Sequence, residues 1–290
     1  MSAAARPPEG GAFSPGEMDA QRPEGRPVSA AARPPGPAAA ADALLAVRGL
    51  SKAFGGVKAV RDVGFTLERG EMLAMIGPNG AGKSTCFNLL NGQLPPDSGE
   101  VLLEGRSIVG LKPREVWRLG VGRTFQITAT FASMTVRENV QMALLSHHRR
   151  LTDWFSRARD AYRDEAERLL ELVGMGEQAQ RACSVLAYGD LKRVELAVAL
   201  ANNPRLLLMD EPAAGMAPRE RVALMALVSG IVKRERIAVL FTEHDMDVVF
   251  NSADRVIVLS RGALIADGAP LQVRANEEVQ RVYLGSRSHG

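Results

Sequence analysis

Short apolar runs alternate along the chain with segments of helical period, starting at about residue 44. Apolar runs of this length are typical of strands, and the run at 71–77 continues directly into a glycine-rich turn. Strands that alternate with helices predict an α/β protein. The predicted strands are LLAVRGL (44–50), VKAVRDVGFTL (57–67), EMLAMIG (71–77), VLLEG (101–105), VGRTFQ (121–126), LLLMD (206–210), IAVLFT (237–242), VIVLS (256–260) and ALIADG (263–268).

Between about residues 113 and 201 the pattern becomes mainly helical, and ARDAYRDEAERLLELVGM (158–175) is its clearest amphipathic segment. We interpret this region as a helical subdomain inserted into the α/β core. The longest apolar run, VALMALVSGIV (222–232), is shorter than the roughly 20 residues that a membrane span needs. It therefore predicts a core helix, and a membrane role would come through a partner.

The segment SVLAYGDLKRVELAVAL (184–200) predicts a helix with an unusual first turn. From Leu191 onward its apolar residues suit a mostly buried helix. Tyr188, Gly189 and Asp190 precede them, at the end where backbone N–H groups are unpaired and the helix dipole is positive. Such an end can be capped by a carboxylate or can hold an anion, and the pattern leaves both interpretations open.

Residues 1–42 contain eight of the 16 prolines, many Ala and Gly residues and few large apolar side chains. Such a composition cannot bury enough apolar surface to fold, so we expect a disordered tail. A secretory signal is not expected because no continuous apolar segment occurs, and the acidic residues argue against an organelle transit peptide. The folded domain is expected to span residues 43–290.

The charges nearly balance, with 36 basic and 33 acidic side chains and a formal net charge of +3. This balance gives no reason to propose a nucleic-acid partner. Cys86 and Cys183 lack the spacing of metal or redox motifs, so we expect two buried free thiols in a reducing cytoplasm. Candidate chemistry must therefore come from sequence motifs.

The segment GPNGAGKS (77–84) fits the phosphate-binding pattern G-x-x-x-x-G-K-[ST] in full. It follows an apolar strand and precedes a helical segment, which is the context that a P-loop requires. Glycines allow successive backbone N–H groups to point at phosphate oxygens. Lys83 would neutralise the β- and γ-phosphates, and the Ser84 hydroxyl would bind Mg²⁺. The predicted nucleotide-binding residues of this segment are Gly77, Pro78, Asn79, Gly80, Ala81, Gly82, Lys83, Ser84 and Thr85.

A second candidate motif, RLLLMDEP (205–212), ends an apolar strand in two carboxylates. A nucleotide site needs such a carboxylate on a strand beside the P-loop, because the metal ion must be held in a fixed place. Asp210 would order Mg²⁺ directly or through water. Glu211 would polarise the attacking water as a general base.

The P-loop, LAYGD (186–190), the Asp-Glu pair and TEHD (242–245) occur in the order seen in ATP-binding cassette (ABC) proteins. The chain resembles an ABC transporter ATPase subunit from about Leu44 to Leu284. This resemblance implies an α/β P-loop NTPase core with an antiparallel β subdomain and an inserted helical subdomain.

The same resemblance implies roles for residues outside the first two motifs. LAYGD would be the signature loop, which contacts the γ-phosphate of an ATP held mainly by the opposite subunit. Gln126 would contact Mg²⁺ and link the site to the membrane partner. His244 would act in catalysis at the γ-phosphate, and Phe54 would stack on adenine. The predicted contact residues of the signature loop are Ala187, Tyr188 and Gly189.

Within the ABC superfamily, the motifs are similar to those of ATPases from branched-chain amino acid importers, in particular the larger of the two ATP-binding subunits. AYGD replaces the common SGGQ, and residues 146–160 resemble an extra segment of that subunit. Further similar stretches are FGGVKAV, GRTFQ, MTVRENV, EPAAGMAP, TEHDM and VQRVYLG.

This resemblance implies that the cofactors are ATP and Mg²⁺. It implies integral membrane permease subunits, a second ATPase subunit (a homologue or the same chain) and, indirectly, an extracytoplasmic solute-binding protein as partners. It also places the chain peripherally on the cytoplasmic face of the inner membrane.

Two positions depart from the common ABC pattern. The signature serine, whose hydroxyl commonly helps to hold the γ-phosphate, is Ala187, and the position often filled by Asp in the D-loop is Ala217. One hydrogen bond to a charged group is worth about 1.5–3 kcal/mol. Backbone N–H groups and the helix dipole near Gly189 can still attract phosphate. AYGD is usual in the family that the chain resembles, so the departure at Ala187 does not imply an inactive site, whereas Ala217 leaves open how the two subunits communicate.

Three other functions remain as alternatives. A urea or amide importer would use the same chemistry for another cargo. Lipopolysaccharide exporter ATPases also end in RVYLG-like sequence, but their SGGE-type signature differs from AYGD. A soluble ABC protein acting on ribosomes or DNA would favour two cassettes or a long coiled coil, and the sequence shows neither. The solute itself would contact the permease and the binding protein.

Overall fold

The computed structural model describes residues 43–124, 130–147 and 162–285. The expected disordered tail at 1–42 and the predicted Mg²⁺ contact Gln126 lie outside these residues. Most of the extra segment at 146–160 lies outside them as well. All helices and strands named below belong to the described part of the chain.

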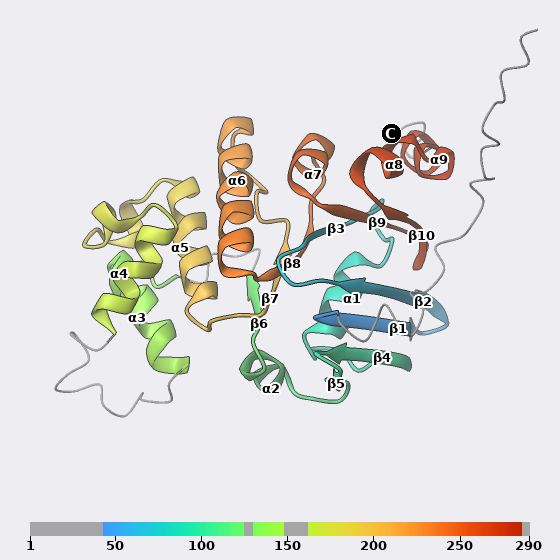
Figure 1. The fold of residues 1–290 in the computed structure, drawn as a ribbon, viewed down its shortest axis with the longest axis horizontal. Helices are drawn as coiled ribbons and strands as arrows, with labels where there is room; N and C mark the ends of the chain where they lie inside the picture. The colour runs from blue at the N-terminus through green and yellow to red at the C-terminus, as the bar shows by residue number, and fades with distance from the viewer. Residues whose placement is uncertain (1–42, 125–129, 148–161, 286–290) are drawn as a thin grey trace, which may run out of the picture. The chain divides into compact units, whose positions relative to one another are not determined.

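A six-stranded sheet lies at the centre of the fold, with the strand order β10-β9-β3-β8-β7-β6 (Figure 1). The five strands from β9 to β6 in this order are parallel, and β10 runs antiparallel to β9. Each strand was predicted from its apolar run, and the α/β fold class is confirmed. The strands are β3 (Met72–Ile76), β6 (Val121–Thr124), β7 (Leu206–Asp210), β8 (Ala238–Thr242), β9 (Arg255–Ser260) and β10 (Ala263–Gly268).

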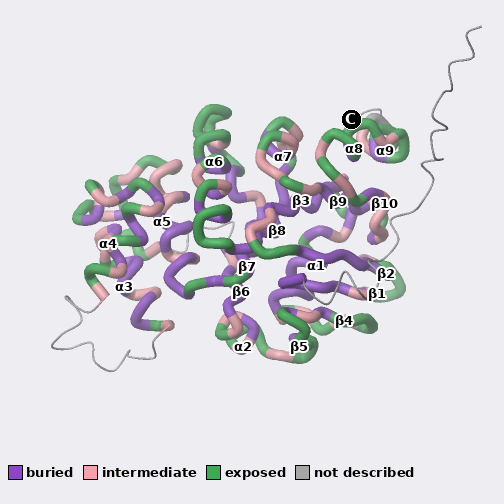
Figure 2. Tube along the Cα trace, viewed as in Figure 1, coloured by how far each residue is buried: buried purple, intermediate pink, exposed green. Residues whose placement is uncertain are grey.

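The central strands are buried on both faces, as Figure 2 shows for β3, β7 and β8. In β3, Leu73 and Met75 pack into one hydrophobic core, whereas Met72, Ala74 and Ile76 pack into another. Residues of β7 and β8 alternate between the same two cores. A parallel strand covered on both faces has no polar side, which explains the continuous apolar runs in the sequence.

The antiparallel β subdomain expected from the resemblance is a four-stranded sheet with the order β2-β1-β4-β5. Phe65 of this sheet, Phe87 of the first helix and Leu73 of β3 belong to the same core, so the two sheets are packed together. Only β5 was not predicted, because two residues are too short to show a pattern. The strands are β1 (Leu45–Phe54), β2 (Val57–Leu67), β4 (Ser98–Leu103) and β5 (Arg106–Ser107).

Nine α-helices and two short 3₁₀ helices complete the described part of the chain. Both cysteines are buried free thiols, as predicted, and burial raises the pKa of the Cys86 thiol to about 12. The α-helices are α1 (Lys83–Leu90), α2 (Pro113–Arg118), α3 (Val136–His147), α4 (Arg163–Leu172), α5 (Tyr188–Leu200), α6 (Pro218–Glu235), α7 (Met246–Ser252), α8 (Pro270–Ala275) and α9 (Glu277–Gly285). The 3₁₀ helices are η2 (Gly176–Gln178) and η3 (Cys183–Val185).

The helices α3, α4 and α5 lie together on the left of Figure 1, away from the antiparallel sheet. Their apolar sides meet through residues such as Val140, Leu170 and Val194, which join the core on the helix-covered face of the six-stranded sheet. The predicted helical region of about 113–201 also contains β6, but β6 pairs with β7 in the six-stranded sheet. The group of three helices therefore follows β6 and is inserted between β6 and β7.

The apolar run at 222–232 forms most of α6, in agreement with the prediction of a core helix. One side of α6 is buried through residues such as Leu224, Val228 and Ile231, and the other side exposes Val222. Arg236 ends this helix in a left-handed conformation. In the described ranges, no helix combines the length and the apolar character that crossing a membrane requires.

Arg255, at the start of β9, joins segments from both sheets. Its guanidinium forms ion pairs with Glu71 (3.2 Å) and Asp267 (3.0 Å) and donates to the backbone carbonyl of Thr66 in β2. Burial raises the pKa of both carboxyl groups, and the nearby Arg255 charge acts in the opposite direction. This charged group therefore fixes the edge of the antiparallel sheet against β9 and β10.

Candidate nucleotide-binding site

The predicted P-loop connects β3 to α1, and close packing requires two of its glycines, Gly77 and Gly82. Gly77, Gly80 and Gly82 all have positive φ angles. A Cβ atom on Gly77 would lie 2.2 Å from the carbonyl oxygen of Leu259, and one on Gly82 would lie 2.3 Å from that of Ala59. The loop is therefore held tightly between the end of β9 and the hairpin of β1 and β2.

Lys83 is the first residue of α1, and its side chain folds back under the loop. Its ammonium donates to the carbonyl oxygens of Gly77 (2.7 Å) and Pro78 (3.2 Å). Burial lowers the pKa of Lys83, while the negative charges of Glu211 and Asp210 act to raise it. A cation fixed at the base of a loop of backbone N–H groups is the arrangement that binds phosphate.

Asp210 is held at the end of β7 by the neighbouring strand. Asp210 and Thr242 are paired in the parallel register of β7 and β8. The Thr242 hydroxyl donates to Asp210 Oδ1 (2.7 Å) and accepts the backbone N–H of Glu211 (3.1 Å). Arg123 Nη2 of β6 lies 3.5 Å from Asp210 Oδ2. The carboxylate is nine-tenths buried and has partners on both neighbouring strands.

Glu211 leaves the strand with a left-handed backbone (φ 49°), and its side chain meets His244. Glu211 Oε1 and His244 Nε2 are 2.7 Å apart. The imidazole is about half exposed and the carboxylate about a quarter exposed, so water can reach both. A carboxylate with access to water and a nearby imidazole is suited to general-base chemistry.

These elements surround one cavity of about 210 Å³. The structure thus brings the predicted P-loop, the Asp-Glu pair and His244 together at the ends of the parallel strands. Among the described residues that line this cavity, Ala59 of β2 is the one that was not predicted. The lining residues are Ala59, Asn79, Gly80, Ala81, Gly82, Lys83, Ser84, Thr85, Asp210, Glu211 and His244.

The oxygen donors of this cavity fit a hard divalent cation that arrives with a polyphosphate. Ser84 and Asp210 supply a hydroxyl and a carboxylate, which are the ligand types that Mg²⁺ prefers. In the part of the chain that the structure describes, no cluster of three His, Cys, Asp or Glu residues could hold a metal ion by itself. Mg²⁺ commonly uses one or two protein ligands and completes its shell with water and phosphate oxygens, so the donor set fits.

The predicted signature residues Ala187, Tyr188 and Gly189 do not line the P-loop cavity. Ala187 is the N-cap of α5, and no side chain caps the helix. Asp190 lies in the first turn, where its Oδ2 accepts a long hydrogen bond from Gln178 (3.4 Å). The backbone N–H groups of this helix end thus remain the candidate anion contact, without a capping carboxylate.

The first turn of α5 contacts the segment at 213–217, which follows Glu211. The Tyr188 hydroxyl donates to the carbonyl oxygen of Ala214 (3.2 Å), and its ring lies beside Gly215. Ala217, which replaces the D-loop aspartate, is the N-cap of α6, and its backbone N–H donates to Glu220 (3.2 Å). Ala217 therefore starts a helix and offers no side chain to a partner.

Phe54, the predicted adenine platform, is the last residue of β1. The residue is 47% exposed, so a planar ligand can reach its side chain. It pairs with Val57 at the hairpin, two residues before the cavity-lining Ala59. Phe54 itself does not line the cavity, and Lys52 Nζ lies 5.8 Å from the centroid of its ring.

Two supporting residues escaped the sequence analysis. Thr242 orients Asp210, and Arg123 reaches the same carboxylate from β6. Both stand inside quoted motifs, TEHD and GRTFQ, but their partners depend on the strand order of the sheet. Only a prediction that β7 lies between β8 and β6 could have found them.

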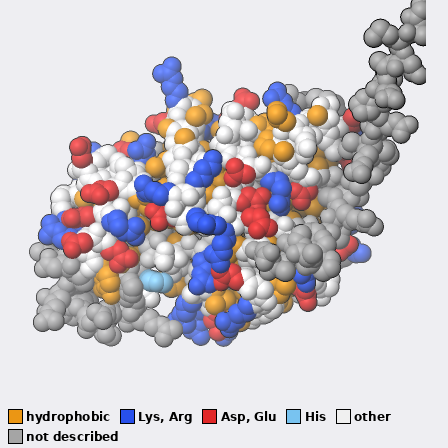
Figure 3. Space-filling view, viewed as in Figure 1, with side chains coloured by type: hydrophobic (Ala, Val, Ile, Leu, Met, Phe, Trp, Pro, Cys, Tyr) orange, Lys and Arg blue, Asp and Glu red, His pale blue; other side chains and the backbone are white. Residues whose placement is uncertain are grey.

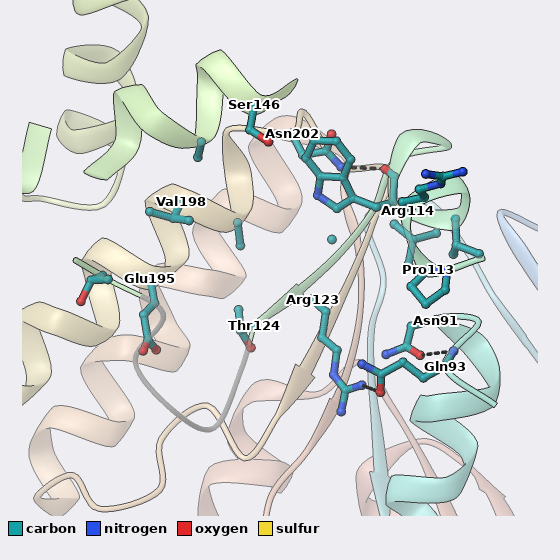
Figure 4. A pocket seen from close by; sticks show the side chains of 17 residues that line it. Asn91, Gln93, Pro113, Arg114, Arg123, Thr124, Ser146, Glu195, Val198 and Asn202 are labelled. Atoms are coloured by element: carbon teal, nitrogen blue, oxygen red, sulfur yellow. Dashed lines mark hydrogen bonds between the residues drawn. The ribbon is translucent and has the colours of Figure 1, made fainter. Parts of the chain in front are cut away.

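A second cavity of about 440 Å³ lies between the helical group and the sheet (Figure 4). Trp117 of α2, Val198 of α5 and the β6 residues Arg123 and Thr124 contribute to its lining. Four buried polar atoms in this lining have no hydrogen-bond partner among the described residues. These atoms are Arg123 Nε, Thr124 Oγ1, Glu195 Oε1 and Asn202 Oδ1.

A mainly parallel sheet with a P-loop, a carboxylate pair on a nearby strand and a packed antiparallel sheet define an ATP-binding cassette. The chain is similar to a solved nucleotide-free ATP-binding cassette from an ABC transporter, with a TM-score of 0.74, 30% identity, and coverage of 83% of this chain and 98% of that one. It is also similar to the ADP conformation of MJ1267, an ATP-binding cassette of an ABC transporter, with a TM-score of 0.75 and 30% identity. That match covers 84% of this chain and 99% of the other.

The sequence comparisons agree with this class. A family model described as ABC transporter matches residues 60–214, and one described as branched-chain amino acid ATP-binding cassette transporter matches residues 263–289. The chain belongs to the ABC transporter ATP-binding family and is an ATPase of that family.

Two curated relatives are named high-affinity branched-chain amino acid transport ATP-binding proteins. They are LivG of Escherichia coli strain K12 and BraF of Pseudomonas aeruginosa. Each is 40% identical over 252 residues, which cover 83% of this chain and 98% of the relative. A probable LivG of Archaeoglobus fulgidus is 34% identical over 251 residues, covering 84% of this chain and 96% of the relative.

The packing of the P-loop predicts a large stability difference between two glycine substitutions. Gly82→Ala should lower the free energy of unfolding by about 4 kcal/mol, because it adds a clash with the backbone of Ala59 to an unfavourable φ. Gly80→Ala is the matched control, since its Cβ would meet nothing within 4 Å and only the positive φ, about 1–2 kcal/mol, opposes it. Urea unfolding without nucleotide measures both, and equal losses would contradict the close approach of Gly82 to β2.

Proposed function

We propose that this chain energises the uptake of branched-chain or similarly hydrophobic amino acids through a separate permease. The main support is the similarity to LivG and BraF, which spans nearly their full length. The match of residues 263–289 to a branched-chain amino acid transporter model supports it independently. In this role the chain would lie peripherally on the cytoplasmic face of the membrane.

In the proposed reaction, the P-loop cavity holds the triphosphate of ATP. Lys83 and the P-loop N–H groups bind the β- and γ-phosphates, and Phe54 supports the adenine. Ser84, Asp210 and Gln126 would hold Mg²⁺, which supplies neutralisation of the phosphate charge. Glu211 accepts the proton of the attacking water, and His244, which already contacts Glu211, orients this carboxylate and reaches the γ-phosphate.

The site is proposed to be completed by a second ATPase subunit. The anion-binding end of α5 lies outside the P-loop cavity of its own chain, and Tyr188 is 43% exposed. A second subunit, either another copy or a homologue, would present its own signature loop to the ATP bound here. ATP then favours the closed pair, and hydrolysis permits reopening, so the chain performs work by a population shift.

The second cavity, which Figure 4 shows, is the proposed docking groove for the permease. Its lining combines apolar side chains with buried polar atoms that have no hydrogen-bond partner among the described residues. A docked protein segment could cover the apolar side chains and supply those hydrogen bonds. It also lies along β6, whose Arg123 reaches Asp210, and β6 leads into Gln126. A permease segment bound in this groove would therefore contact β6, the strand whose Arg123 supports the candidate Mg²⁺ ligand Asp210.

The face in Figure 3 shows basic and acidic side chains side by side over much of its area. Such a surface lacks the single-sign field on which nonspecific binding to nucleic acid depends. This mixed charge supports the proposal of a protein partner.

The role of Glu211 predicts a separation of binding from turnover. Glu211→Gln should bind ATP with unchanged affinity, but its kcat should fall by about 10²–10⁴-fold, because the amide cannot accept the proton. Equilibrium binding and ATPase assays measure the two effects. Glu177→Gln, an exposed carboxylate on η2, is the control and should behave like the wild type. Rapid turnover by Glu211→Gln would overturn the assignment of the general base.

If the permease binds in the docking groove, a bulky substitution in that groove should weaken the association of the chain with the permease. Ser146 is exposed on α3 and lines the groove, so Ser146→Arg should block a docked segment without touching the P-loop cavity. We expect this variant to keep its basal ATPase activity but to lose the permease during co-purification from native membranes. Ala226→Arg on the exposed side of α6 is the control.

Mass spectrometry of the wild-type complex identifies the permease, and uptake of labelled leucine tests the cargo. Recovery with a urea permease or with exporter subunits would overturn the proposed cargo, and recovery with ribosomes would overturn the transporter role. Equal recovery of the permease with Ser146→Arg would contradict only the proposed groove.

A further inference from the structure

The segment 213–214, which follows the candidate general base, contacts Glu243, which has no role in the reaction described above, and Tyr188, a predicted residue of the signature loop. Glu243 binds it from the end of β8, and Tyr188 binds it from the first turn of α5. We propose that Glu243 and Tyr188 are positioning residues that connect the signature loop to Glu211 within one subunit. This inference rests on the proposed function and adds a route by which the two ATP sites of a pair communicate.

Glu243 connects two backbone segments through its two carboxylate oxygens. Oε1 accepts the backbone N–H of Ala213 (2.8 Å), and Oε2 accepts that of His244 (3.3 Å). The residue is only 5% exposed, and burial raises the pKa of its carboxyl group. A buried carboxylate is expensive unless it is hydrogen-bonded, so its two bonds hold these segments at a fixed separation.

Tyr188 contacts the same segment at the next residue, Ala214. Its hydroxyl donates to the carbonyl oxygen of Ala214 (3.2 Å), and its ring occupies the space beside Gly215. The backbone N–H of Ala214 donates in turn to the carbonyl oxygen of Glu211 (3.1 Å). One tight turn therefore carries the general-base candidate at one end and the Tyr188 contact at the other.

The contacts that begin at Tyr188 and Glu243 lead to the carboxylate of Glu211, the candidate general base. Glu243 fixes the backbone of His244, and His244 Nε2 lies 2.7 Å from Glu211 Oε1. A phosphate that moves the exposed first turn of α5 would shift the turn at 213–214 through Tyr188. Because Glu243 links that turn to His244, the shift changes the contact between His244 and Glu211.

This route does not use the side chain at the D-loop position. Ala217 has no polar atom beyond its backbone, whereas Tyr188 and Glu243 reach the two residues Ala213 and Ala214 by hydrogen bonds to their backbone. The chain can therefore couple signature loop and general base although the D-loop aspartate is absent.

A double-mutant cycle tests the proposal in the full-length chain. Tyr188→Phe removes one hydroxyl, and Glu243→Gln keeps the shape of the side chain but places an N–H₂ group toward a backbone N–H. We expect kcat to fall about 3–10-fold in the first variant and about 10–100-fold in the second, as for a neutral and a charged hydrogen bond. The double variant should be no slower than Glu243→Gln, because both changes interrupt one route.

The affinity for ATP separates positioning from a general loss of structure. The Kd of a fluorescent ATP analogue should stay close to the wild-type value in all three variants, because the P-loop is untouched. The thermal midpoint should stay close to the wild-type value for Tyr188→Phe. It should fall in the two variants with Glu243→Gln, because a buried N–H₂ group then faces a backbone N–H, but both should remain folded at the assay temperature. Glu115→Gln is the matched control, since that carboxylate also accepts a backbone N–H, that of Lys112 (2.8 Å), at the start of the distant α2. It should leave kcat unchanged.

Multiplicative losses of kcat in the double variant would overturn the connection between Tyr188 and Glu243. A loss of ATP affinity that accounts for the lower rates would overturn the positioning role. Both outcomes differ from a failure of the proposed function, in which the wild-type chain itself would not hydrolyse ATP or would not co-purify with a permease.

Discussion

The hydrogen bond between Thr242 and Asp210 is the interaction around which the site is built. It joins the last residues of two adjacent parallel strands, and the same hydroxyl accepts the backbone N–H of Glu211. One threonine thus fixes the candidate metal ligand and the start of the turn that carries the general base. Since Asp210 is nine-tenths buried, this bond and the nearby Arg123 guanidinium offset the cost of burying its carboxylate group. The register between β7 and β8 is therefore a requirement of the chemistry as well as of the fold.

Two close contacts place the phosphate-binding loop against this carboxylate. Gly77 and Gly82 approach the backbone of β9 and β2, and Lys83 binds the loop from below. The antiparallel sheet therefore has two roles at the site. It carries Phe54, and its strand β2 packs directly against the P-loop at Gly82. Arg123 extends the same site along β6 toward the second cavity, which is the proposed docking groove. In the proposed function, the second ATPase subunit and the permease would each contact a different segment that leads to Asp210 or Glu211.

Most of the fold could be predicted from the sequence because the strands are buried on both faces and the P-loop stands between a strand and a helix. What the sequence could not show depends on contacts between distant segments. The two-residue strand β5 exists only through its pairing with β4. The Asp190 carboxylate suits a helix cap, yet the helix begins at Tyr188 and Ala187 occupies the capping position. Glu243 is an ordinary residue of TEHD until the fold brings Ala213 to it.

The central claim is that one ATP is bound by the P-loop of one subunit and the signature loop of another. The most direct measurement mixes two inactive full-length variants. Lys83→Ala removes the cation of the P-loop, and Gly189→Asp adds a carboxylate to the signature loop that repels the γ-phosphate. A mixed pair contains one site with an intact P-loop and an intact signature loop. We expect the mixture to regain ATPase activity that neither variant has alone. Mixed pairs that form but remain inactive would contradict a site shared between subunits.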